Sequence, residues 1–413
     1  MHCNVRLVGL ASVVLFLAGC QCGGDREGSS EGATVAASGQ ELLLPDRVIL
    51  APEAVAALVG APDGSRSGRV EGVEPALIRM PPERGAITSS TLEGEVRWEA
   101  DVGRLHPGAV VIDGALIVRG RTASEDGPIQ PTLTAVELTT GEVRWRHRDE
   151  EALHFGVPTA AGREVYAMRI QPDGCVGVGI LDARTGEAND PIETPCLRFV
   201  SSAPLELAEA SIRPDGEGAV VLGRSEQTTH ALVSLGIDGE VRWRVEAALG
   251  TQVPVAPVVL SGVVLALDRG VRAIDRDSGE LFWHAEMTAR EMAVADGRIY
   301  VTDGADVRCL DAADGTTRFT VSLPAAGRSP RVHGDLLLVE TDTGVHALST
   351  EDGEPRWVYG SADRVSSIAM TEHAVFVATS RQVLRLGLDD GDASVLAEQG
   401  GQYLLAVEPL PVP

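Results

Sequence analysis

The chain has 413 residues, and its 35 basic and 60 acidic residues give a formal net charge of −25 at pH 7. All of the basic residues are arginine, because the sequence contains no lysine. This composition excludes Schiff-base chemistry and P-loop phosphate binding, which both need lysine. The negative charge also argues against nucleic acid as a partner. Hydrophobic residues make up 44% of the chain and charged residues 23%, as in ordinary folded proteins.

The first residues are typical of a secretion signal. Arg6 precedes an apolar run over residues 7–19, which is too short for a transmembrane helix. The run ends in Leu17-Ala18-Gly19-Cys20, which resembles the lipobox of bacterial lipoproteins. The resemblance implies cleavage before Cys20 and a lipid on its sulfur. The alternative is an ordinary secreted protein that is cut nearby.

Four segments follow from this start. Residues 1–19 form the signal, and residues 20–40 are rich in Gly, Ser and Glu and predict a flexible tether. Residues 41–84 predict an irregular lead, with one short helix over 52–59. Residues 85–413 hold a repeat. Gln21, where an Asp would imply retention at the inner membrane, favours an outer-membrane anchor on the periplasmic face; an inner-membrane or cell-surface anchor is the alternative.

The repeat is marked by aromatic residues that follow a glycine by four positions. All five tryptophans occupy this place, one further copy has Phe319, and the copies at Gly186 and Gly391 have lost the aromatic residue. The spacing of roughly 40–45 residues suits one four-stranded propeller blade. The predicted blade anchors are Trp98, Trp145, Trp243, Trp283, Phe319 and Trp357.

Short β-branched runs between Asp-Gly and Ser-Gly turns predict antiparallel strands throughout the repeats. The expected fold is therefore all-β, an eight-bladed β-propeller of four-stranded antiparallel blades, with seven blades as the alternative. We expect residues 402–407 to supply the inner strand of the first blade and close the ring. Alternation along a last strand predicts that Val96 and Trp98 face inward while Glu95 and Arg97 keep the rim soluble.

Two phrases of the repeat, residues 271–283 and 345–357, resemble the tryptophan-docking repeat of pyrroloquinoline-quinone-type propellers. The resemblance covers most of the chain after the tether and implies a ring of eight blades. The alcohol-oxidising members of that group use two adjacent cysteines, an Asp base and Glu, Asn and Asp around calcium. Here no two cysteines are adjacent, and Asn189 is the only asparagine after the signal. We therefore expect no quinone or other cofactor, no metal and no enzymatic activity.

The cysteines predict one disulfide bond. The third repeat should turn at Thr185 and Gly186, and paired positions of an antiparallel hairpin have residue numbers with a constant total. The residue numbers of Cys175 and Cys196 add up to the same total as those of the two turn residues. The two cysteines would therefore lie opposite one another. Two buried free thiols are the alternative. Cys309 is expected to be a small buried residue.

Two classes of function remain open. The longest repeats are consecutive, so residues 122–128, 171–174 and 225–229 would form extra loops on one sector, with 213–217 on the opposite face. The lipobox, tether and ring are similar to the propeller lipoproteins of the outer-membrane barrel-assembly machinery. That similarity implies a monomeric scaffold with a protein partner and a lipid anchor in the membrane. The alternative is a ligand-binding or enzymatic propeller with a site in the central funnel.

Overall fold

The structure is a computed structural model, and it describes the chain in ten stretches. These are residues 67–70, 74–81, 86–123, 129–192, 212–214, 218–224, 230–247, 257–260, 262–398 and 403–409. All of them belong to the compact unit Asp46–Pro413. The predicted signal, tether and short helix over 52–59 lie outside these residues. Within the ten stretches, no helix is long and apolar enough to cross a membrane.

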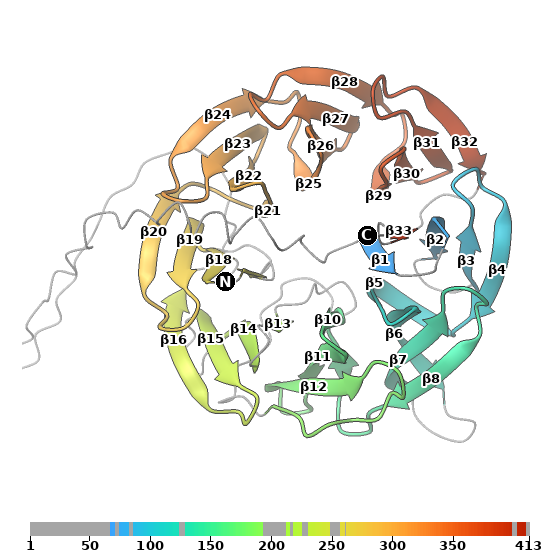
Figure 1. The fold of residues 1–413 in the computed structure, drawn as a ribbon, viewed down its shortest axis with the longest axis vertical. Helices are drawn as coiled ribbons and strands as arrows, with labels where there is room; N and C mark the ends of the chain where they lie inside the picture. Colours follow the sequence, from blue (N-terminus) through green and yellow to red (C-terminus); the bar gives the residue numbers. More distant parts are fainter. Residues whose placement is uncertain are drawn as a thin grey trace, which may run out of the picture. The chain divides into compact units, whose positions relative to one another are not determined.

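Eight β-sheets stand around a common centre, so the unit is a propeller with eight blades (Figure 1). The predicted all-β fold with eight blades is confirmed, and the alternative of seven is wrong. Each blade is numbered here by its order in the chain. The chain passes from the inner strand of a blade to its outer strand and then to the next blade.

The first four blades contain strands β1 to β16 and the last strand, β33. Blade 1 has β1 (Ser67–Val70), β33 (Tyr403–Pro409), β2 (Ala76–Met80), β3 (Ala86–Ser90) and β4 (Val96–Asp101). Blade 2 has β5 (Arg104–Ile112), β6 (Ala115–Ala123), β7 (Ile129–Glu137) and β8 (Val143–Arg148). Blade 3 has β9 (His154–Phe155), β10 (Thr159–Ala161), β11 (Glu164–Ile170) and β12 (Val176–Asp182). Blade 4 has β13 (Ile212–Pro214), β14 (Gly218–Arg224), β15 (His230–Gly236) and β16 (Val241–Ala247).

The last four blades are more regular. Blade 5 has β17 (Val258–Val259), β18 (Val263–Leu267), β19 (Gly270–Asp275) and β20 (Leu281–Glu286). Blade 6 has β21 (Glu291–Ala295), β22 (Arg298–Asp303), β23 (Asp306–Asp311) and β24 (Thr317–Ser322). Blade 7 has β25 (Arg328–His333), β26 (Leu336–Thr341), β27 (Gly344–Ser349) and β28 (Pro355–Gly360). Blade 8 has β29 (Val365–Met370), β30 (Val375–Thr379), β31 (Val383–Leu386) and β32 (Ala393–Ala397).

The carboxyl-terminal strand closes the ring, as the sequence predicts. β33 pairs antiparallel with β2 over five positions, from Ala76–Val407 to Met80–Tyr403. β1 adds a fifth strand in parallel on the other edge of β33. The first blade therefore combines strands from both ends of the described chain, which ties the last blade to the first.

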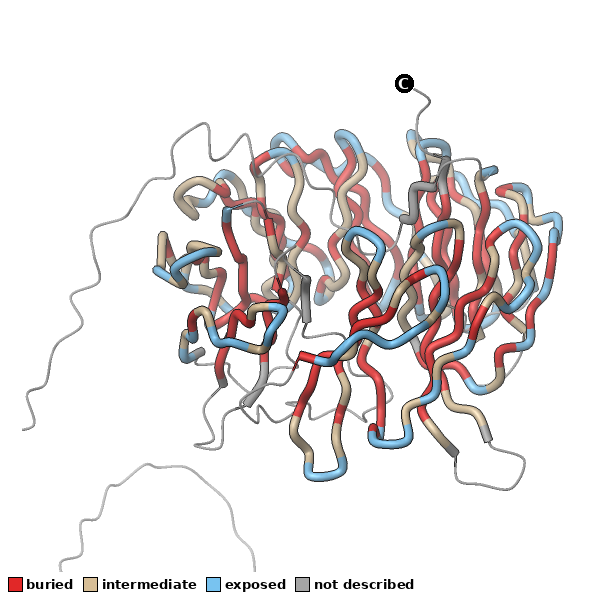
Figure 2. Tube along the Cα trace, turned by 60° about the horizontal axis from the view of Figure 1, so that its bottom comes forward, coloured by how far each residue is buried: buried red, intermediate tan, exposed pale blue. Residues whose placement is uncertain are grey.

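The hydrophobic core lies between adjacent blades rather than at one centre. Buried residues gather in clusters that each draw on two neighbouring sheets, for example those around Trp145 and Trp283. Figure 2 shows the buried residues along the strands and the exposed ones at the turns. Eight similar joints thus share the burial of apolar surface that a single core supplies in other domains.

One prediction about the outer strands is wrong. Val96 is 54% exposed whereas Trp98 is 8% exposed, so the two do not share a face. A β-bulge causes this difference, because Ser89 pairs with Trp98 but Ser90 pairs with Val96, which leaves Arg97 as the extra residue. The same shift occurs between Trp283 and Leu281 and in the other blades that carry a docked aromatic residue.

Candidate functional site

Every predicted aromatic anchor lies at a joint between blades. Each tryptophan N–H donates to a backbone carbonyl of the next blade's hairpin. The pairs are Trp98–Leu138 at 2.8 Å, Trp145–Ala183 at 2.9 Å, Trp243–Arg276 at 2.6 Å, Trp283–Ala312 at 3.2 Å and Trp357–Leu388 at 2.6 Å. Phe319 has no such donor and packs beside Gly353 of blade 7.

The turn glycine of each docked hairpin is needed for two reasons. Gly141 has a φ of 77°, which a residue with a side chain rarely adopts. A Cβ atom there would also lie 2.7 Å from the ring of Trp98. The glycine and the aromatic residue in the repeat phrase therefore belong to two different joints.

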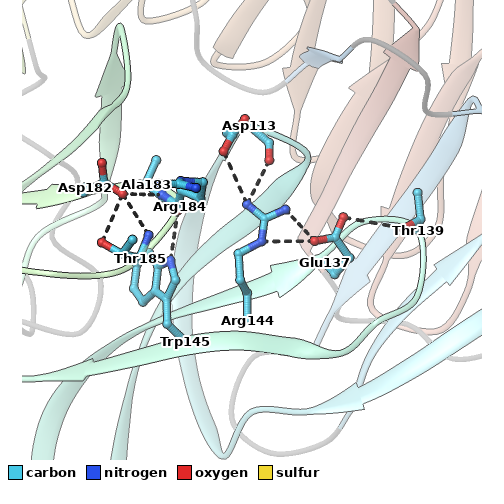
Figure 3. A network of polar contacts seen from close by, with 9 residues as sticks. All are labelled: Asp113, Glu137, Thr139, Arg144, Trp145, Asp182, Ala183, Arg184 and Thr185. Atoms are coloured by element: carbon cyan, nitrogen blue, oxygen red, sulfur yellow. Dashed lines mark hydrogen bonds and ion pairs between the residues drawn. The ribbon is translucent and has the colours of Figure 1, made fainter.

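The arginine before the aromatic residue bonds within its own blade, which the sequence interpretation missed. Figure 3 shows Arg144 between two carboxylates. Its Nη2 and Nε contact Glu137 Oε2 at 2.5 and 3.1 Å, and its Nη1 donates to the Asp113 carbonyl at 2.9 Å. Arg318 makes the equivalent contact with Asp311 in blade 6. Arg144 thus ties two hairpins of its blade together.

Of the predicted lipid and disulfide residues, only Cys175 can be placed. Cys20 and Cys196 lie outside the described residues. Cys175 stands directly before β12 and is disulfide-bonded, while the buried Cys309 is free. The bridge between Val178 and Ile192 gives a total of residue numbers one lower than the predicted register. The pairing of Cys175 with Cys196 therefore stays a prediction.

The third blade differs from its neighbours at its outer edge. Residues 187–192 form no strand there, and make isolated bridges through Ala188 and Ile192. The position of the docked aromatic residue is taken by Asp190, which is exposed. Within the described residues, the outer edge of blade 3 therefore docks no aromatic residue on blade 4.

The long repeats place their extra length in one kind of hairpin. β6 and β7 have nine residues each, and the matching strands of blades 3 and 4 have seven, against four to six in blades 5 to 8. These hairpins link the second and third strands, so in a meander they emerge on the same face as the links between blades. The loops 124–128, 215–217 and 225–229 lie outside the described residues.

A pocket of about 270 Å³ opens at the joint between blades 2 and 3. Its apolar lining includes Leu133 of β7, Phe155 of β9, Ala167 of β11 and Leu181 of β12. All four of these residues are at most 3% exposed. Polar lining comes from the link between the blades, residues 147–151, and from Asn189 at the irregular outer edge. We call this cavity the joint pocket.

A glycine leaves room for the joint pocket. Gly179 stands seven residues before its turn glycine, where other blades have Arg272, Arg308 and His346. Without a side chain at Gly179, the stem of Arg169 lies against the strand, since a Cβ atom would be 3.0 Å from Arg169 Cδ. This exchange of a large residue for glycine is a signal that the sequence carries, and the sequence interpretation did not use it.

An ion pair forms one wall of the joint pocket. Arg169 Nε donates to Asp149 Oδ2 at 2.6 Å, and the two side chains are 12% and 10% exposed. The other oxygen of Asp149 accepts the backbone N–H groups of Glu151 and Ala152. Burial acts to raise the pKa of Asp149, but the arginine and these N–H groups outweigh it and hold the pKa below its ordinary value.

His147 faces the pocket from β8. Its ring lies 6.1 Å from the ring of Phe155, centroid to centroid, and makes no hydrogen bond within the described residues. Burial lowers the pKa of His147, the charge of Asp149 raises it and that of Arg169 lowers it, with a net decrease. The ring is therefore neutral at pH 7 and offers one donor and one acceptor.

A second polar cluster lies behind the same short strand. Arg119 is 1% exposed, and its Nη1 lies 3.3 Å from His154 Nε2 and 3.1 Å from the Phe155 carbonyl. Because a guanidinium only donates, this His154 nitrogen is an acceptor. His106 stacks edge-on against His154 at 5.2 Å. The strand β9 thus carries a buried polar network on one side and the joint pocket on the other.

The arrangement at the joint pocket suits binding. It combines an apolar floor, a hydrogen-bonding ring and a charged wall, which is the usual composition of a recognition site. Across the ten described stretches, no group of three His, Cys, Asp or Glu residues stands close enough to hold a metal ion. The turn at Asp275 resembles a calcium loop in sequence, but its carboxylate accepts bonds from Asp277 and Ser278 and caps a hairpin.

A ring of eight blades whose tryptophans dock on the next hairpin defines a propeller of the pyrroloquinoline-quinone type. The chain belongs to the family described as outer membrane protein assembly factor BamB, whose family model matches residues 83–267 and 267–406. No curated protein matches the sequence significantly.

Solved structures share the fold at low identity. BamB from Moraxella catarrhalis is 14% identical with a TM-score of 0.53, over 76% of this chain and 91% of that one. The dihydro-heme d1 dehydrogenase NirN is 13% identical with a TM-score of 0.58, over 87% and 82%. Quinohemoprotein alcohol dehydrogenase from Comamonas testosteroni is 12% identical with a TM-score of 0.54, over 86% and 77%. The structures that share this fold thus include BamB and two proteins described as dehydrogenases.

Proposed function

We propose that the protein is a non-catalytic scaffold that binds a protein partner during outer-membrane protein assembly. The observation that carries the proposal is the family match, which runs along the ring from residue 83 to residue 406. The description of that family is an assembly factor, and the extra loops expected from the sequence on one sector of the ring suit such a role. We expect the ring to act as a monomer.

The proposal includes a lipid anchor. Leu17-Ala18-Gly19-Cys20 supports attachment through Cys20, and Gln21 supports the outer membrane with the ring on its periplasmic side. Residues 21–66 then separate the anchor from β1. The proposed tether within this stretch is residues 20–40, whose Gly, Ser and Glu content favours a flexible link between the anchor and the ring.

A catalytic role has weaker support. The enzymes with this ring are 12 and 13% identical to the chain, which is a likeness of fold alone. The sequence has no adjacent cysteine pair and only one asparagine after the signal, so the cysteine pair that the quinone enzymes use has no counterpart. A scaffold fits these residues better than a quinone-dependent oxidoreductase.

Affinity capture from solubilised membranes tests the proposal. The full chain with a carboxyl-terminal tag should retain the pore-forming subunit of the barrel-assembly machinery through a salt wash. A Cys20→Ser variant, which cannot be acylated, is the matched control and should be found free of the membrane. Recovery of no assembly subunit, together with saturable binding of a small molecule in the funnel, would favour the alternative function.

A further inference from the structure

The joint pocket is larger than the packing of the ring requires. Trp145 already fills the joint between blades 2 and 3, where its N–H reaches Ala183 and its ring covers Gly186. The pocket lies beyond this contact, and its volume of about 270 Å³ is below the ~300–1,000 Å³ of sites that enclose a drug-sized ligand. Its size therefore suits one large side chain.

The lining selects an aromatic side chain that carries a hydroxyl group. Leu133, Phe155 and Leu181 offer an apolar floor for a ring. His147 faces the same space with a neutral imidazole that makes no hydrogen bond within the described residues. A buried aromatic hydroxyl needs a partner, and this imidazole supplies one.

The charged residues at the mouth of the pocket indicate which residues flank the bound aromatic side chain in its partner. The wall pair Asp149–Arg169 is neutral as a unit. Among the other residues that line the pocket, Glu150 and Glu151 are exposed carboxylates and Arg148 is an exposed cation. Glu151 Oε2 also lies 3.5 Å from Arg169 Nη2, so the lining as a whole carries three acidic and two basic side chains. The rim is therefore acidic and attracts a basic segment.

We propose that the joint pocket receives one tyrosine side chain from a partner protein, in a segment where basic residues flank the tyrosine. The inference rests on the proposed scaffold function and names the chemistry of its contact. The phenol ring lies on the floor of the pocket, its hydroxyl bonds His147, and the flanking cations meet the carboxylates of the rim. A buried aromatic anchor of this kind supplies much of the energy of an interface.

The first test uses p-cresol, which is the tyrosine side chain alone, and toluene, which lacks the hydroxyl. The full-length acylated protein is placed in lipid nanodiscs, and the imidazole signals of 13C-labelled histidine are followed during titration, with His147→Phe assigning the signal. We expect p-cresol to shift the His147 signal and to bind about fivefold tighter than toluene. In the His147→Phe variant, the preference for p-cresol over toluene should vanish while both compounds still bind. Binding to this variant is followed with fluorinated analogues of the two compounds.

Filling the pocket gives the second variant. Gly179→Val narrows the cavity, and its Cβ displaces only the flexible stem of Arg169. Gly360→Val is the matched control, because Gly360 ends a strand with open space around it. Both should keep the wild-type circular dichroism spectrum, but Gly179→Val alone should lose p-cresol binding and recover about tenfold less partner in membrane capture.

The outcomes separate this inference from the scaffold function. If p-cresol leaves the His147 signal unchanged while the assembly subunit is still captured, the scaffold stands and the pocket inference is overturned. If p-cresol binds but Gly179→Val captures as much partner as Gly360→Val does, the pocket is not the docking site and the inference is also overturned. If the wild-type protein captures no partner but still binds p-cresol, the scaffold function is refuted. The inference that a partner protein supplies the tyrosine is then overturned as well.

Discussion

At the scale of single residues, the ring depends on pairs of one aromatic side chain and one glycine from adjacent blades. Trp283 is 4% exposed, donates to Ala312 at 3.2 Å and covers Gly315, whose φ is 71°. Each pair stabilises its joint in two ways, because the indole is buried and its N–H makes a hydrogen bond. The two contributions together exceed either one alone. Phe319 shows that a joint also forms without the indole N–H.

Replacing Trp283 with alanine should therefore cost about 3–5 kcal/mol of unfolding free energy, because it opens a cavity between blades 5 and 6. Trp283→Phe is the matched control and should cost about 1–2 kcal/mol, since it keeps most of the apolar contact and loses the hydrogen bond. Urea unfolding followed by circular dichroism measures both. Equal losses of stability in the two variants would mean that the aromatic side chain at position 283 does not support the joint.

His147 should make the joint pocket sensitive to acid. Burial, with a smaller contribution from Arg169, lowers its pKa against the attraction of Asp149. Because the unfolded chain then binds the proton more tightly, this contribution to stability is complete above pH ~6.5 and is lost as the pH falls from there through the folded-state pKa. His147→Phe should thus lose less stability between pH 7.5 and pH 5.5 than wild type does. If the stability of the two proteins changes equally with pH, His147 is not the source of the acid sensitivity.

At the scale of elements, two joints lack an aromatic anchor and each has another feature in its place. Blade 8 has Val395 at the anchor position, 51% exposed, and the joint to blade 1 is instead crossed by β33. Blade 3 has Asp190 there, and Cys175, directly before β12, is disulfide-bonded. A covalent link in the third blade would reduce the entropy that its irregular outer edge gains on unfolding.

Peptide mapping under non-reducing conditions should find Cys175 linked to Cys196. Removing the bond with Cys175→Ala should cost about 3 kcal/mol, as expected for a closed loop of this length. Cys309 is the internal control, because burial raises the pKa of its thiol to about 11 and it should stay reduced and unalkylated in the folded protein. A bond to Cys22 instead would refute the pairing.

The sequence predicts the blades well because the same phrase recurs in each. Trp283 and Gly315 could be read from spacing alone, since every copy carries the same pair of constraints. The side of the strand that Val96 occupies could not be predicted in this way, because a β-bulge inserts one residue and the alternation of side chains fails beyond it. The joint pocket could not be predicted for a related reason: it forms where Gly179 and Ala167 of one blade meet Leu133 of another, and the repeat phrase of one blade does not show which residues of the next blade face it.

At the scale of the whole molecule, the propeller is a closed ring whose stability depends on one closure. Each blade contacts two neighbours, so an open ring would leave two joint faces exposed to water. β33 prevents this by joining β2 over five positions, and the Leu404 N–H also donates to Ser367 of blade 8 at 3.1 Å. The residues Leu404 to Val407 are all at most 3% exposed.

Weakening this closure should destabilise the ring as a whole. Leu405→Ala removes a side chain that is 3% exposed and packs with Ile78 and Trp98 in the joint between blades 1 and 2, and should cost about 2–5 kcal/mol. Val395→Ala, on the outer strand of blade 8, should stay within about 0.5 kcal/mol of wild type because its side chain is half exposed. Hydrogen exchange should then show faster opening in Leu405→Ala for blades 1 and 8 together, since both lose support when β33 detaches. Faster exchange confined to blade 1 would mean that β33 completes a blade without closing the ring.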